Sequence, residues 1–94
     1  MNIEGPDLHG YFQSLESEIE KLRADLPGVF LDDKDAEHYN SFIGAGEYGL
    51  AFEELTCSAL EKNISVSLPL YKRIESIAEL MKISDDHWKA IKVF

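Results

Sequence analysis

Apolar residues recur every three or four positions along most of this 94-residue chain, and this spacing places them on one face of an α-helix. The longest such run predicts an amphipathic helix over about residues 7–25, with Asp7 as its N-cap. Pro27 and Gly28 are typical of the turn that follows a helix, and residues 29–31 form a short apolar connector. The apolar positions of this first helix are Leu8, Tyr11, Phe12, Leu15, Ile19, Leu22 and Leu26.

The same spacing predicts two further helices in the middle of the chain. One begins at the acidic residues 32–35, whose charges suit the positive end of a helix, and it ends at residues 44–46. The other begins at Glu47 and ends near Asn63, a residue type that accepts the left-handed backbone found after a helix. The expected apolar positions are Ala36, Tyr39, Phe42 and Ile43 in the first of these helices, and Leu50, Ala51, Leu55, Ala59 and Leu60 in the second.

The last third of the chain predicts a fourth helix, capped by Ser67, and a short fifth helix that begins at Ser84 and carries Trp88 and Ile91. The apolar face of the fourth helix is Leu70, Ile74, Ile77, Ala78 and Met81. Residues 64–68 alternate as a strand does, but the sequence offers no second strand, so we expect an extended linker. The prediction is one domain, residues 1–94, with an all-α fold: a small antiparallel bundle of four to five helices.

The charge of the chain narrows the choice of partner. Nine basic and 18 acidic residues give a net charge of −9 at pH 7, and the excess of acid lies in the first 54 residues. Residues 29–54 hold seven acidic residues and one basic residue, Lys34. Such a surface repels the phosphates of nucleic acid and attracts a basic protein. We therefore expect a basic protein partner and no binding to nucleic acid.

The sequence also indicates a compartment. No apolar run approaches the roughly 20 residues of a membrane-spanning helix, and residues 1–7 have neither the basic start nor the apolar stretch of a secretory signal. The one cysteine, Cys57, cannot form an internal disulfide. Because it lies beside an apolar helix face, we expect it to be a small buried thiol. These features predict a cytoplasmic protein without membrane contact.

The acidic residues and histidines lack the spacing of a metal site. A calcium loop that began at Asp33 would have His38 at its sixth position, where Gly is required, and Gly44 at its twelfth, where Glu is required. The other metal-binding residue types have no local ligand spacing: His9, His38, His87 and Cys57. The carboxylates are expected on solvent-facing helix surfaces, where their pKa values suit no catalytic role. We therefore expect no metal, no cofactor and no catalytic residue.

One segment is unusual for a core helix. Tyr48 and Phe52 lie four residues apart among three acids, and Gly49 costs up to ~1 kcal/mol relative to Ala one turn into a helix. In one interpretation the rings and carboxylates form a hot spot for a protein partner, in which Tyr anchors and charge steers. In the other, both rings belong to the core and Gly49 admits a neighbouring helix.

Residues 47–55, Glu-Tyr-Gly-Leu-Ala-Phe-Glu-Glu-Leu, resemble a segment of the MafI-type immunity proteins of bacterial polymorphic toxin and contact-dependent growth inhibition systems. The likeness extends over about residues 44–91. It implies a small helical protein that binds and neutralises the C-terminal domain of a cognate toxin. These toxins are commonly nucleases (RNase, tRNase or DNase) with a basic active site.

The resemblance does not identify the contact residues, so we predict them from charge and aromatic placement. The first group is Glu47, Tyr48, Glu53 and Glu54, and the second is Asp32, Asp33, Asp35 and Glu37. The alternative to an immunity protein is an acidic adaptor or small regulator that binds another basic protein. Neither interpretation requires an enzyme.

Overall fold

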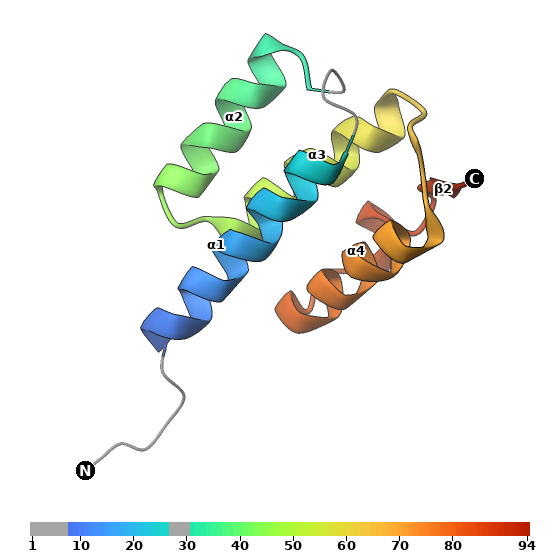
Figure 1. The fold of residues 1–94 in the computed structure, drawn as a ribbon. Helices are drawn as coiled ribbons and strands as arrows, with labels where there is room; N and C mark the ends of the chain where they lie inside the picture. The colour runs from blue at the N-terminus through green and yellow to red at the C-terminus, as the bar shows by residue number, and fades with distance from the viewer. Residues whose placement is uncertain (1–7, 27–30) are drawn as a thin grey trace.

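The computed structural model of the chain describes residues 8–26 and 31–94 (Figure 1). Its helices are α1 (Leu8–Asp25), α2 (Asp33–Gly44), α3 (Tyr48–Glu61) and α4 (Leu68–Met81), followed by a one-turn 3-10 helix, η1 (Asp85–His87). Two short strands, β1 (Ser65–Val66) and β2 (Lys92–Val93), complete the described elements. The predicted all-α bundle is confirmed. The predicted cap Asp7, the turn at Pro27–Gly28 and most of the connector, and the side chains of Leu8 and Phe12, lie outside the part described.

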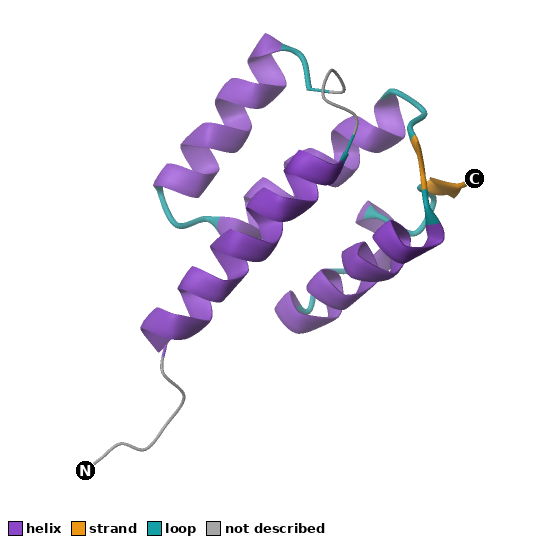
Figure 2. Ribbon diagram, in the orientation of Figure 1, coloured by secondary structure: helices purple, strands orange, loops and turns teal. Residues whose placement is uncertain are grey.

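Helix α3 lies at the centre of the arrangement. It contacts α1, α2 and η1, whereas α4 packs on α1. Helices α1 and α3 run in one direction and α2 and α4 in the opposite direction, so neighbours α2 and α3 are antiparallel, as are α1 and α4 (Figures 1 and 2). The central position explains why α3 buries the largest set of residues in any one element: Ala51, Phe52, Leu55, Thr56, Ser58 and Ala59.

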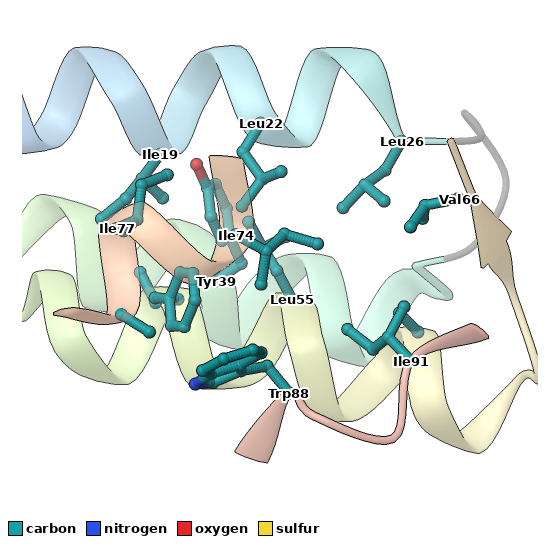
Figure 3. Packing of buried hydrophobic residues seen from close by; sticks show 14 residues of the cluster. Ile19, Leu22, Leu26, Tyr39, Leu55, Val66, Ile74, Ile77, Trp88 and Ile91 are labelled. Carbon is teal, nitrogen blue, oxygen red and sulfur yellow. The ribbon is translucent and has the colours of Figure 1, made fainter. Parts of the chain in front are cut away.

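The hydrophobic core takes residues from every helix and from the C-terminal segment (Figure 3). Its buried members include Ile19, Leu22 and Leu26 of α1, Tyr39 of α2, Leu55 of α3, Ile74, Ile77 and Ala78 of α4, and Val66, Trp88 and Ile91. The predicted helix faces are confirmed at these positions. Leu50 is an exception, because 43% of it is exposed. The expected face of α3 was drawn too wide: the helix turns by about 100° between Leu50 and the buried Ala51.

Local signals at the helix ends place the helices as predicted. The Asp32 carboxylate accepts a hydrogen bond from the Asp35 N–H at 2.8 Å, and the Ser67 hydroxyl accepts one from the Leu70 N–H at 3.3 Å. Asn63 has the expected left-handed backbone, with φ 58°. Lys82 takes the same conformation after α4, with φ 57°, although its residue type gives no such signal.

The predicted fifth helix and the predicted linker are both wrong. Ser84 does begin a helical turn, since its hydroxyl accepts from the Asp86 N–H at 3.3 Å, but η1 ends after His87. The chain then extends into β2, which pairs in parallel with β1 (Ser65 opposite Lys92). Trp88 and Ile91 are three residues apart and both buried, a spacing that imitates a helix. The alternation at residues 64–68 was a true strand signal with a partner only two residues long.

Two further observations bear on the predicted class of protein. No helix in residues 8–26 or 31–94 is both long and apolar enough to cross a membrane. Cys57 is exposed, so the prediction of a buried thiol is wrong. Its polar neighbours in sequence are buried instead, because each finds a hydrogen-bond acceptor: Thr56 donates to the Phe52 carbonyl and Ser58 to the Asp35 carboxylate, both at 3.2 Å.

Candidate functional site

The acidic and aromatic residues at the start of α3 are neighbours in sequence but face three different elements. The Tyr48 hydroxyl donates to the Glu16 carboxylate of α1 at 3.1 Å. Glu53 lies 3.7 Å from His87 of η1, and Glu54 lies 3.7 Å from His38 of α2. The helix therefore distributes the first predicted group over three sides, and no single surface holds all of its members.

A hollow lies at the N-terminal end of α3, beside α1 and the end of α4. Its lining includes Tyr11, Leu15, Gly46, Glu47, Tyr48, Gly49 and Met81. Glu47 is exposed at the helix start and makes no side-chain capping bond. This carboxylate is therefore available to a partner at the edge of a largely apolar depression.

Each interpretation of the aromatic pair is right about one ring. Phe52 is completely buried in the core, whereas Tyr48 is half-buried beside the hollow. Burial raises the pKa of Tyr48, and the hydrogen bond to the Glu16 carboxylate raises it further. Gly49 does not admit a neighbouring helix, since no atom lies within 4 Å of the place where its Cβ would be. Packing thus gives no reason for a glycine here.

The second predicted group, at the start of α2, divides into an outer and an inner part. Asp33 and Glu37 are exposed, and Asp32 is exposed while it caps the helix. Asp35 turns toward α3, where it accepts hydrogen bonds from Lys62 at 3.0 Å and from Ser58 at 3.2 Å. The outer acids are accessible to a partner, whereas Asp35 belongs to the contact between the two helices.

The inner part joins two carboxylates of different character. The hydrogen bond from Lys62 holds the pKa of Asp35 below its usual range, although burial opposes this shift. Burial and the negative charge of Asp35 raise the pKa of Glu54. The negative charge at this junction is therefore stabilised on Asp35 and disfavoured on Glu54.

Polar contacts also join α1 to α2. The buried ring of Tyr39 places its hydroxyl against the Glu20 carboxylate, to which it donates. The Arg23 guanidinium lies 4.6 Å from the centre of the same ring and donates to Asn40 at 3.1 Å. Burial and the hydrogen bond to Glu20 raise the pKa of Tyr39 far above its usual range. These side chains link helices, and the sequence gave no sign of the pairing.

Sequence spacing missed one set of potential metal ligands. Asp35 and His38 lie one turn apart on α2, and the packing of α3 brings Glu54 to them, so that one ligand atom from each lies within 4.8 Å of the others. The Asp-x-x-His spacing was the only local signal, because the third residue comes from a different helix.

Comparison of the chain with protein-family models, with curated proteins and with solved structures gives no match. The resemblance of residues 44–91 to MafI-type immunity proteins stays a prediction. The functional argument therefore depends on the charges and surfaces of the chain itself.

Proposed function

We propose that this protein is an immunity protein that binds a basic toxin domain, a nuclease in the first instance, and neutralises it without catalysing a reaction. The observation that carries the proposal is Glu47, an exposed carboxylate at the edge of the hollow beside Tyr48. The proposal places the protein in the cytoplasm, where such a toxin meets its substrate.

The hollow suits the side chain of an arginine or lysine from a partner. The stem of such a side chain is apolar and packs well on residues such as Leu15 and Met81, while its charge is attracted by a carboxylate. The face of the Tyr48 ring adds a surface on which a guanidinium stacks. Gly49 leaves space above the first turn of α3, since no atom lies within 4 Å of its Cβ position.

The outer acids of α2 support the same class of partner. Asp32, Asp33 and Glu37 are exposed, and the chain carries a net charge of −9. A negative surface of this kind raises the rate at which a positively charged protein arrives. In this proposal the α2 acids steer the toxin domain, and Glu47 and Tyr48 hold it.

The proposal is tested by calorimetric titration of the full chain with the toxin domain encoded by the adjacent gene. Glu47→Gln should weaken binding by about 2 kcal/mol, because it removes the charge at the hollow, and should leave the melting temperature unchanged. The matched control is Glu79→Gln, which changes an exposed carboxylate on α4 and should bind as the wild type does.

Two results would count against the proposal at different levels. If Glu47→Gln and Tyr48→Ala stay folded and bind normally, the hollow is not the interface, and the surface of Asp32, Asp33 and Glu37 becomes the candidate. If the wild-type chain does not bind the adjacent toxin domain, the immunity function is wrong. The same acidic surface would then favour the second candidate function, an adaptor or small regulator for another basic protein.

A further inference from the structure

We infer that Asp35, His38 and Glu54 form a binding site for a divalent transition-metal ion, with Zn²⁺ the best match, that bridges α2 and α3. One imidazole nitrogen and two carboxylate oxygens already lie within 4.8 Å of one another. The His38 Nδ1 is 3.7 Å from the Glu54 Oε1. This inference is independent of the proposed toxin partner.

The three residues are held by rigid elements. Asp35 and His38 lie one turn apart on α2, so their side chains share a face of that helix. Glu54 comes from the adjacent antiparallel helix α3. The side chains of Asp35 and Glu54 are each 18% exposed, and that of His38 is 47% exposed. The two carboxylates therefore form the floor of the site, and the imidazole lies at its open side, where an ion enters.

The charges of the junction favour a cation. Lys62 lies 3.0 Å from Asp35 and 3.8 Å from Asp32, so its charge is directed to those two carboxylates. Glu54 faces the neutral form of His38 at physiological pH and is close to the negative charge of Asp35, which helps raise its pKa. A metal ion between the three residues supplies the positive charge that Glu54 lacks.

The ligand types distinguish among metals. Zn²⁺ accepts nitrogen and oxygen ligands in a tetrahedral site with bonds of about 2.0–2.2 Å, and a water completes a set of three protein ligands. Calcium requires six to eight oxygens and magnesium a near-octahedral set of oxygens, neither of which this group offers. The atoms must move inward by on the order of 1 Å to reach zinc distances, and the exposed imidazole of His38 is free to make most of that movement.

The test uses the full chain, freed of metal with a chelator, and measures its melting temperature and its heat of binding with Zn²⁺. An excess of Zn²⁺ should raise the melting temperature by about 5 °C or more, because the ion binds the folded chain. His38→Ala and Glu54→Gln should each lower the affinity for Zn²⁺ at least tenfold. Lys62→Met should raise it severalfold, since Lys62 competes for Asp35.

Two variants keep the assignment falsifiable. His87→Ala is the matched control, because His87 makes a similar contact with Glu53, at 3.7 Å, away from the proposed site; it should bind Zn²⁺ normally. Cys57→Ser should also bind normally, although its exposed thiol is the other strong zinc ligand on α3. Absence of a Zn²⁺ heat from the wild type, equal affinity in His38→Ala, or loss of binding in Cys57→Ser would each overturn the inference.

Discussion

Helices α1–α3 and the segment from residue 64 onward are held to the molecule by different kinds of contact. Across the first region, polar side chains join one helix to another: Tyr39 with Glu20, Tyr48 with Glu16, and Asp35 with Lys62. The second region docks mainly through apolar residues, chiefly Val66, Trp88 and Ile91, which are all buried. Arg73 of α4, which donates to Asp25 of α1, is its main polar link to the helices before it.

The difference follows the distribution of charge. Residues 29–54 hold seven acids and one base, whereas residues 55–94 hold five acids and six bases. Where acids are dense, the fold positions some by hydrogen bonds and leaves others exposed. The near-neutral C-terminal segment adds buried apolar area instead. The comparison teaches that the first region presents charge to a partner while the second stabilises the domain.

The largest expected effect tests the apolar docking of the second region. Trp88 is 7% exposed, and its ring meets that of Tyr71 edge to face at 5.8 Å. Trp88→Ala should lower the free energy of unfolding by ~3–5 kcal/mol, measured by denaturant titration. Phe94→Ala is the control, since Phe94 is 84% exposed and its loss should change little. An unchanged midpoint for Trp88→Ala would mean that the segment does not dock through this ring.

The next effect tests the polar links of the first region. Tyr39→Phe removes the hydroxyl that donates to Glu20 and should lower the free energy of unfolding by about 1 kcal/mol near neutral pH. The pKa of Tyr39 is raised in the folded state, so the stability it contributes is complete below its ordinary pKa of about 10 and is lost as the pH rises further. Tyr39→Phe should lack that alkaline loss, and an identical alkaline profile would contradict the role of this hydrogen bond.

A glycine pair sharpens the distinction between binding and stability within the first region. Gly49→Ala should raise the free energy of unfolding by about 0.5–1 kcal/mol, because the site is helical and no atom lies near the new Cβ. Gly46→Ala should lower it, since Gly46 has a φ of 75°. Thermal unfolding of both variants measures the difference. A destabilised Gly49→Ala would show that the first turn of α3 needs glycine for its fold.

The smallest expected effect concerns the junction of α2 and α3 in the absence of metal. Burial and Asp35 raise the pKa of Glu54 in the folded state, so folding favours its protonated form, and stability falls as the pH rises above about 4.5. Glu54→Gln should therefore raise the free energy of unfolding at pH 7 by about 0.5 kcal/mol, with no gain below pH 4. A loss of stability at pH 7 would mean that Glu54 makes a stabilising contact as a carboxylate.

The sequence predicted the elements whose signals are local. The spacing of Leu22, Leu55 and Ile74 located buried helix faces, and Asp32 and Ser67 located helix starts. The pairing of β1 with β2 was missed because its two strands are two residues long and separated by α4. No local pattern encodes such a pairing, and the buried Trp88 and Ile91 imitated a helix.

The candidate site was harder to predict for the same physical reason. Glu47, Glu53 and Glu54 are close in sequence, but a helix turns each residue by about 100°, and their contacts are on different elements. Asp35, His38 and Glu54 are brought together by helix packing, which sequence spacing does not reveal. The exposed acids of α2 were predictable because a solvent-facing position depends on the helix alone.

The most direct test of the central claim is the rate of association with the adjacent-gene toxin domain as a function of salt. The account predicts that kon falls tenfold or more as ionic strength rises from about 10 to 150 mM, since the screening length shortens from about 30 to 8 Å. Replacing Asp33 and Glu37 by their amides should flatten this dependence, whereas Glu79→Gln should not. A kon that is indifferent to salt would contradict the claim that the acidic helices present charge to a basic partner.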